Sequence, residues 1–350
     1  MTQGAVISGV GVVEPLPARR VPQAVDSGPG LHAEAATGDQ GVRALRYALG
    51  AIWLLDGALQ LQPFMFTRGF VSDVIVPSAQ GNAGFVSHPT LAIAHLMLAD
   101  VATWNALFAT IQVLLGAGIL AGTRTRRASL LRLALAGSIA WSAAVWWLGE
   151  GLGGVLAGAS PLAGAPGAVA LYAVAGVLLW PGDGASAPLL GSHLARALWA
   201  GSWAISAFLL LEPPNQARGA VASVVSQAAT GEPGPVRAML AEVAGSLRGA
   251  GPWLDSLLAL VMLGIGLAVA LRFLPRAALF VSIVLASAIW VFGEAFGGIL
   301  SGQGTDPNSG PLWVLLSLCM WAGLGGQAAV RVPGAHAAST TTDLLGQQAG

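Results

Sequence analysis

Two stretches of this chain follow one pattern: WWLGEGLGGVLAG over residues 146–158 and WVFGEAFGGILSG over residues 290–302. In each, a Trp precedes a Glu by four residues, and two Gly residues follow that Glu at the third and fourth positions. An apolar composition generates chance matches of Ala and Leu, but it does not generate a matched series of Trp, Glu and Gly. The two stretches therefore indicate an internal repeat.

The match continues upstream of this motif. The motif itself recurs at an offset of 144 residues, and an offset of 150 residues aligns the preceding region. The pairs matched at that second offset are Arg46/Arg196, Trp53/Trp203, Pro63/Pro213, Arg68/Arg218, Gly69/Gly219, Val71/Val221, Val74/Val224, Gly81/Gly231 and Gly84/Gly234. We therefore predict a first membrane repeat over 43–182 and a second over 193–330, flanked by disordered cytoplasmic tails at 1–42 and 331–350.

The composition places these repeats in a membrane. Of the 350 residues, 55% are hydrophobic and 9% are charged, whereas about 25% of the residues of a soluble domain are charged. Apolar stretches long enough, or nearly so, to cross a bilayer lie at about 45–62, 100–122, 128–149, 165–181, 193–211, 253–272, 277–299 and 311–329. We predict an all-α fold, a polytopic transmembrane helical bundle of about eight spans arranged as two parallel four-helix repeats, with the lipid bilayer as partner.

Arginine positions predict the orientation, because cytoplasmic loops carry an excess of basic residues. All 16 basic residues are Arg, and twelve of them fall on one side of the predicted spans. The four on the other side are Arg68, Arg218, Arg237 and Arg248. This predicts a multi-pass protein of the cell inner (plasma) membrane with both termini in the cytoplasm and both Gly-Glu motifs on the outer side.

Several classes of function find no support in the sequence. The formal net charge is zero, which gives no electrostatic basis for binding nucleic acid. The single Cys, Cys319, excludes an intramolecular disulfide and a cysteine-clustered metal site. The chain contains no Walker loop, no H-E-x-x-H and no G-x-S-x-G. No catalytic residue is predicted, and no cofactor is indicated by a motif.

The Glu of each repeated motif lies at the end of an apolar helix, where a charge is costly unless it is paired, protonated or hydrated. One interpretation is a pair of carboxylates, Glu150 and Glu294, that binds a cation, a proton or a polar headgroup. The pair would lie near the pseudo-twofold axis that is expected to relate the two parallel repeats. The other is structural, with Glu capping a turn, Gly allowing close helix packing and Trp anchoring the interface. The other residues of the motif are Trp146, Gly149, Gly153 and Gly154, and Trp290, Gly293, Gly297 and Gly298.

Three acidic or amide residues outside the motif have no counterpart in the other copy. Asp306 and Asn308, together with Ser309, supply oxygen ligands for a hard cation. The sequence D-P-N-S-G over 306–310 is equally typical of an ordinary turn that starts a helix. Asp56 lies within the first predicted span, and Ser206 stands at its repeat position. With Gln60 and Gln62 on the same helix, it indicates either a polar face that lines an internal cavity or a neutral Asp hydrogen-bonded to an adjacent helix.

Two His residues form the weakest candidate site. His88 and His95 are seven residues apart and share one face if the segment is helical, with Asp100 about one turn further on. A metal or quinone-contacting cluster is one interpretation. Interfacial His residues without any ligand are the other, and this interpretation is favoured because the pair does not recur in the second half.

The order of features in each half resembles the DoxX/DoxD-like family of four-helix membrane proteins. Arg46 begins a helix that continues as Leu49-Gly50 and Trp53-Leu54-Leu55-Asp56-Gly57, a half-polar segment follows, and 114–120 and 125–128 form the next helix and turn. The order recurs with 263–267 and 272–276. The resemblance covers about 45–330, in two copies. It implies a four-helix fold in a bacterial plasma membrane and, for some relatives, a part in quinone-linked thiosulfate oxidation or redox-stress complexes.

Three functions remain open at this point. The first is a non-enzymatic subunit or scaffold of an envelope or respiratory complex, with other membrane or envelope proteins as partners. The second is a transporter of a small solute or ion that uses the paired acidic residues. The third is a quinone-linked oxidoreductase subunit, an expectation that depends on the family resemblance alone. The positions of Glu150 and Glu294 discriminate between the first two, since a scaffold predicts capped turns and a transporter predicts a shared polar cavity.

Overall fold

The apolar stretches of the sequence form a bundle of helices. A computed structural model of the chain describes residues 29–182 and 189–330, and these ranges contain helices and turns but no strand. The bundle consists of α1 (Pro29–Leu59), α4 (Val101–Thr125), α5 (Ala128–Leu148), α6 (Ala168–Leu178), α7 (His193–Leu210), α10 (Pro252–Ala270), α11 (Pro275–Ala288) and α12 (Ser309–Val330). The predicted all-α class is confirmed.

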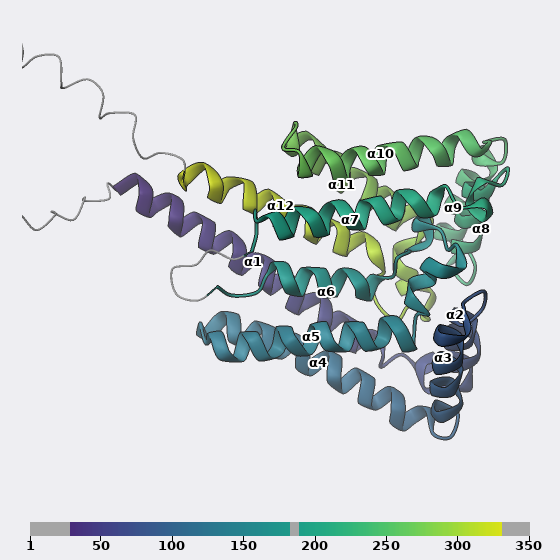
Figure 1. The fold of residues 1–350 in the computed structure, drawn as a ribbon. Coiled ribbons are helices and arrows are strands. Elements are labelled where there is room, and N and C mark those ends of the chain that lie inside the picture. The colour runs from purple at the N-terminus through teal and green to yellow at the C-terminus, as the bar shows by residue number, and fades with distance from the viewer. Residues whose placement is uncertain (1–28, 183–188, 331–350) are drawn as a thin grey trace, which may run out of the picture.

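Shorter helices cover one end of this bundle. They are α2 (Val76–Ser78), α3 (Gly84–Met97), α8 (Ala220–Ala228) and α9 (Gly234–Leu247), together with the short turns η1 (Pro63–Phe66), η2 (Phe70–Ile75) and η5 (Pro213–Gln216). Figure 1 shows α2, α3, α8 and α9 at the end opposite to the start of α1 and the end of α12. The segments that connect the long helices therefore differ greatly between the two ends of the bundle.

Within the described ranges, four helical segments are long and apolar enough to cross a membrane unaided. They are α4, α5, α10 and the continuous stretch Pro275–Gly293, in which the π-helical turn η6 (Ile289–Gly293) extends α11. Helix α6 and residues 309–324 of α12 are apolar but shorter. The chain is thus an integral membrane protein with transmembrane helices.

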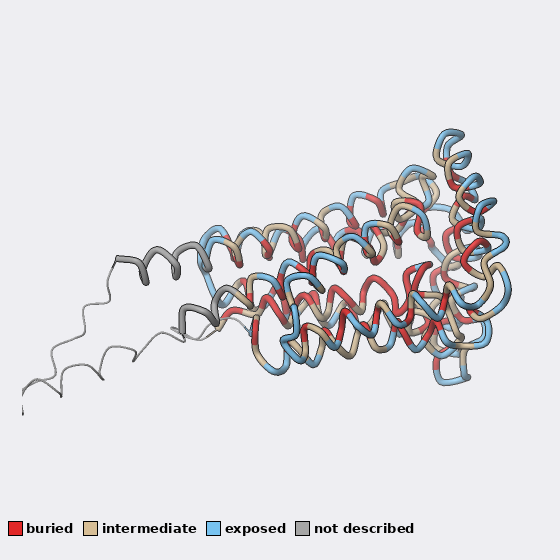
Figure 2. Tube along the Cα trace, turned by 90° about the horizontal axis from the view of Figure 1, so that it is seen from above, coloured by how far each residue is buried: buried red, intermediate tan, exposed pale blue. Residues whose placement is uncertain are grey.

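The outer faces of the helices support this conclusion. Figure 2 shows buried residues where helices face one another and exposed residues along the outside. The exposed side chains include Leu114, Leu133, Leu260 and Leu271, each at least 65% exposed. Apolar side chains spread so widely over a surface would favour aggregation in water, but they suit contact with lipid.

The first helix begins earlier than the sequence predicts. The prediction assigned residues 29–42 to a disordered tail, whereas α1 begins at Pro29 and continues into the bundle without interruption. Proline is well tolerated in the first turn of a helix, and the Ala residues that follow have high helix propensity. Residues 1–28 and 331–350, which the prediction also assigned to tails, lie outside the described residues.

The helices pack in two similar sets. Helix α1 packs mainly on α4 and α5 on α6, while α7 packs mainly on α10 and α11 on α12. Helix α12 also packs on α1 and α6 and so joins the two sets. The crossing of α1 and α4 depends on Gly116, because a Cβ at this position would lie 2.7 Å from the carbonyl oxygen of Gly50. Small residues allow such close backbone contact between membrane helices.

Candidate functional site

Each repeated motif forms a left-handed turn immediately after a helix. In the first copy, Gly151, Leu152, Gly153 and Gly154 have φ values of 56°, 58°, 61° and 69°. In the second copy, the residues from Ala295 to Gly298 have φ values of 46°, 58°, 74° and 66°. Left-handed backbone costs roughly 1–2 kcal/mol for each residue with a side chain, so glycine at half or more of these positions lowers the cost of the turn.

This turn changes the role of the motif glycines. The sequence predicts that another helix or backbone segment packs closely on Gly153, Gly154, Gly297 and Gly298. All four lie in η3 (Leu152–Ala157) or η7 (Ala295–Ser301), where their φ angles are not helical. The predicted seventh span, 277–299, correspondingly ends as a helix at Gly293. The glycines permit close approach to a loop rather than to a second helix.

The loop that each turn approaches is held by the motif Trp. The indole N–H of Trp146 donates to the carbonyl oxygen of Pro166 over 2.7 Å, and that of Trp290 donates to the carbonyl oxygen of Pro307 over 2.9 Å. A Cβ at Gly153 would lie 1.8 Å from the same Pro166 oxygen, and one at Gly297 would lie 2.6 Å from that of Pro307. Both copies of the motif therefore pack against a proline carbonyl in the same way.

We expect Trp146→Phe and Trp290→Phe to destabilise the protein equally. Each removes one hydrogen bond to a carbonyl group, worth about 1 kcal/mol, and leaves most of the ring contact in place. Thermal unfolding of the purified protein in detergent measures the effect, with Trp321→Phe on the exposed face of α12 as the control. A loss for one variant only would contradict an equivalent role of the two motifs.

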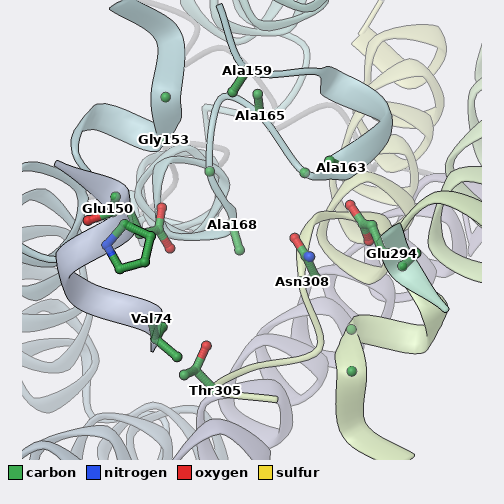
Figure 3. Close-up of a pocket in the computed structure, with 18 of the residues that line it drawn as sticks. Val74, Glu150, Gly153, Ala159, Ala163, Ala165, Ala168, Glu294, Thr305 and Asn308 are labelled. Carbon is green, nitrogen blue, oxygen red and sulfur yellow. The ribbon is translucent and has the colours of Figure 1, made fainter. Parts of the chain in front are cut away.

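The two motifs line one cavity at the end of the bundle that carries the short helices. Its volume is about 690 Å³, and both halves of the chain contribute to its wall. Glu150 and Glu294 approach it from opposite sides, with Asn308 between them (Figure 3). The loops before α6 and α12, the ends of α2 and α8, and the short turn η4 (Pro161–Ala163) complete the wall. The structure thus brings together the two Glu residues that the sequence singled out.

The charged side chains in this wall are all acidic, and they lie among neutral polar residues and many Gly and Ala residues. The four carboxyl groups belong to Glu150, Glu232, Glu294 and Asp306, and among the described residues no Arg or His lines the cavity. Burial raises the pKa of Glu232 above its usual value. A cavity with this lining carries negative charge or bound protons, and it attracts cations.

Glu294 caps the helix that follows it. Its carboxylate accepts hydrogen bonds from the hydroxyl of Ser309 and, over 3.0 Å, from the backbone N–H of Gly310, both in the first turn of α12. Burial raises the pKa of Glu294 to about 7, although these hydrogen bonds lower it, and the nearby Asp306 adds to the rise. Glu294 therefore changes its charge close to neutral pH.

Glu150 occupies the corresponding place before α6 but has fewer partners. Its carboxyl group accepts a hydrogen bond from the backbone N–H of Val169. Ala168 occupies the position that corresponds to Ser309 in the second copy, so no hydroxyl is present there. Its Oε2 is buried and has no hydrogen-bond partner in the described part of the chain. Burial, followed by the charge of Asp306, raises the pKa of Glu150 well above its usual value. This oxygen is therefore an unsatisfied acceptor on a residue that lines the cavity.

Asp306 and Asn308 form the turn that the sequence allowed as an alternative to a cation site. Asp306 Oδ1 accepts from the backbone N–H of Asn308, and Asn308 Oδ1 accepts from that of Ser309, both over 2.7 Å. Both residues line the cavity, so they position α12 and also contribute to the wall. Burial raises the pKa of Asp306.

Asp56 lies deeper in the protein than the cavity wall. Its side chain is 2% exposed, and its Oδ2 accepts a 2.5 Å hydrogen bond from the hydroxyl of Tyr172 on α6. This arrangement matches the predicted contact with an adjacent helix. Gln60 and Gln62 do not line the cavity; Gln62 donates to the carbonyl oxygen of Gly304 instead.

The His pair is separate from this site. His88 and His95 both lie on α3, and neither lines the cavity. No group of three or more metal-binding side chains occurs among residues 29–182 and 189–330. The arrangement gives no support for the metal interpretation of this pair.

Sequence reasoning missed two contributors to the site. Glu232 and Asn82 come from the segments before α9 and α3, and both line the cavity. The sequence contained no signal for either of them. Ser309, which the sequence offered as an oxygen ligand, donates its hydroxyl to Glu294 instead. Comparison with protein-family models, curated proteins and solved structures gave no match.

Proposed function

We propose that this chain is a multi-pass plasma-membrane protein that binds a small cation bearing N–H groups at its outer face, as the binding site of a transporter. Three unpartnered oxygens support the proposal: Glu150 Oε2, Glu232 Oε2 and Asn82 Oδ1 are buried without a hydrogen-bond donor in the described chain. All three belong to residues that line the cavity. Because buried acceptors without a hydrogen bond are costly, a ligand with N–H donors would stabilise them.

The dimensions and charges of the cavity favour an organic cation over a single bare metal ion. Its volume of about 690 Å³ lies within the range of small-molecule sites, roughly 300–1,000 Å³. The carboxyl groups are distributed around the wall and do not converge on one point. The wall contains no Trp, Tyr or Phe in the described chain, whereas quaternary ammonium ions are bound by aromatic cages. A primary amine, which donates three hydrogen bonds, suits this lining best.

The proposal includes two parallel four-helix repeats with eight spans. The similar backbone angles of the two motifs support it, as do the matched Trp–Pro hydrogen bonds. Two contacts between the halves are also reciprocal in kind. Asn215 donates to the carbonyl oxygen of Gly158, after the first motif, and Gln62 donates to that of Gly304, after the second. A pseudo-twofold axis along the membrane normal would relate the two repeats.

The orientation follows from the basic residues. The turn between α4 and α5 contains Arg126 and Arg127 and follows Arg124, and the turn between α10 and α11 contains Arg272 and precedes Arg276. Both turns lie at the end of the bundle opposite to the cavity (Figure 1). By the positive-inside rule, this end is cytoplasmic and the cavity opens on the outer side. The resemblance to the DoxX/DoxD-like family remains a proposal for the four-helix unit, and a quinone-linked role depends on that resemblance alone.

Removing both motif carboxylates tests the proposal. We expect the purified wild-type protein to bind methylammonium and putrescine, measured by calorimetry, and tetramethylammonium to bind far more weakly because it lacks N–H donors. A hydrogen bond to a charged group contributes about 1.5–3 kcal/mol, so Glu150→Gln and Glu294→Gln should each weaken binding roughly 10- to 100-fold. The double variant should show no measurable binding.

The control is Glu242→Gln, which makes the same chemical change at an exposed position of α9 outside the cavity. It should bind like the wild type. Equal binding by the control and the double variant, or no binding of any amine by the wild type, would contradict the proposal.

A structural subunit or scaffold is the second candidate, and one observation favours it. The carboxylate of Glu294 already accepts hydrogen bonds from Ser309 and Gly310 at the start of α12, as expected for a helix cap. On this view Glu294→Gln lowers thermal stability and no amine binds. The calorimetric experiment therefore discriminates between the two candidates.

A further inference from the structure

Asp56 and Tyr172 form a polar pair within the apolar bundle, next to the cavity but not in its wall. Tyr172 is fully buried, and its hydroxyl donates a hydrogen bond to Asp56 Oδ2. The other oxygen, Oδ1, is buried without a partner in the described chain. An acidic side chain at this depth is costly when charged, so such residues in membrane helices usually mark functional sites. Its unpartnered oxygen is a place where a proton binds.

We infer that Asp56, held by Tyr172, is a proton-binding site whose occupancy is coupled to the cation in the cavity. The coupling to the cation rests on the proposed function, whereas the proton-binding site itself does not. A proton from the water of the cavity binds at Oδ1 and makes Asp56 neutral, and it returns to that water when Asp56 becomes a carboxylate. No other reactant is needed, and no other bond is formed or broken.

The second half of the chain provides the internal comparison. Trp53 and Tyr172 pack with ring centroids 4.3 Å apart at 36°, and Trp203 and Trp313 pack with centroids 4.3 Å apart at 34°. Trp203 matches Trp53 in the repeat, so Trp313 stands where Tyr172 stands in the first half. The two ring contacts are nearly identical.

The acid, in contrast, is absent from the second half. Ser206 occupies the repeat position of Asp56, and its hydroxyl donates to the carbonyl oxygen of Ser202 on its own helix. A Ser and a Trp therefore satisfy the packing at this place without any buried charge. The corresponding place in the second half packs without an Asp–Tyr pair, and this favours a function for the pair of the first half.

The charges around Asp56 explain the coupling. The titratable groups that act on it are Tyr172 on α6, Asp306 before α12 and Glu150 after α5. Helix α4 contributes only Arg124, in its last turn, and the described side chains of α12 contribute only Cys319. A negative charge on Asp56 therefore repels those on Asp306 and Glu150. A cation beside these two carboxylates offsets the repulsion, so it favours release of the proton.

Infrared difference spectroscopy of the full-length protein in nanodiscs tests the inference with protons as the only ligand. On titration with acid, the wild type should gain a carboxylic acid C=O band that is absent from Asp56→Ser/Tyr172→Trp, the variant that copies the second half. Ser206→Ala serves as the matched control and should retain the band. An unchanged band in a folded double variant would overturn the inference.

Tyr172→Phe covers the case in which the double variant does not fold. It removes only the hydroxyl and keeps the ring against Trp53, so the band should remain but move to higher frequency as the C=O group loses a donor. A band that does not move would show that it belongs to another carboxyl group and would overturn the inference.

Putrescine then tests the coupling. Its addition should release protons from the wild type, measured with a pH dye in weak buffer, and fewer from Asp56→Ser/Tyr172→Trp, which should still bind putrescine. Equal proton release from both would overturn the coupling. If the wild type shows the Asp56 band but binds no amine, the proposed function fails while the proton site stands.

Discussion

Gly153→Ala should remove most of the folded protein from the membrane. Gly153 has a φ of +61°, and a Cβ there would lie 1.8 Å from the Pro166 carbonyl oxygen. That oxygen cannot move away easily, because it accepts the indole N–H of Trp146. The left-handed backbone alone costs about 1–2 kcal/mol for alanine, and displacing the loop brings the total to roughly 3 kcal/mol or more.

The amount of monodisperse protein after detergent extraction measures this effect, together with the thermal midpoint. Gly245→Ala is the matched control, since Gly245 is exposed on α9 and a Cβ there would meet no other atom within 4 Å. Alanine is favoured over glycine in a helix by about 1 kcal/mol, so the control should be as stable as the wild type or more so. A Gly153→Ala protein with a normal yield and midpoint would exclude the steric role of the turn.

The affinity for amines should depend strongly on pH near neutrality. The pKa of Glu294 is raised by burial to about 7, and that of Glu150 is raised as well. A cation binds the carboxylate form, so the affinity for putrescine should increase as the pH rises through about 7. For each proton released on binding, the affinity should fall roughly tenfold for each pH unit below that point.

The free energy of unfolding of the protein without amine should decrease as the pH rises, whereas the affinity for amines should increase. The folded state binds the Glu294 proton more tightly than the unfolded state, whose pKa is about 4.5. The free energy of unfolding contributed by this group is therefore largest below about 4.5 and falls as the pH rises to about 7. Thermal midpoints measured over this range, with and without putrescine, test both statements. Glu294→Gln should flatten both curves, and a wild-type affinity that does not change with pH would contradict the assignment.

Much of the fold was predictable because it depends on local composition. The lack of charged residues and the length of the apolar stretches indicated membrane helices, and the start of α5 at Ala128 and of α7 at His193 agree with the predicted starts. The error at residues 29–42 has a local cause, since the prediction followed hydropathy, whereas α1 continues beyond its apolar part.

The candidate site was predictable only in part. The recurrence of Glu150 and Glu294 drew attention to two carboxylates, and the structure brings both to one cavity. Their different environments were not predictable. Ser309 lies next to one carboxylate and Ala168 next to the other, and this contrast depends on how the loop after each motif folds back. Hydrophobic periodicity contains no information about such a loop.

The repeated Trp, Glu and Gly residues by themselves indicated an internal repeat and a helix end near each motif. They did not determine what the glycines do, because a left-handed turn and a close helix contact require the same small residue. Only the tertiary structure decided this, by bringing a proline carbonyl against each turn. It also decided that Asp56 meets Tyr172, a residue 116 positions away, since such a contact depends on how α1 and α6 pack and not on the sequence near either residue.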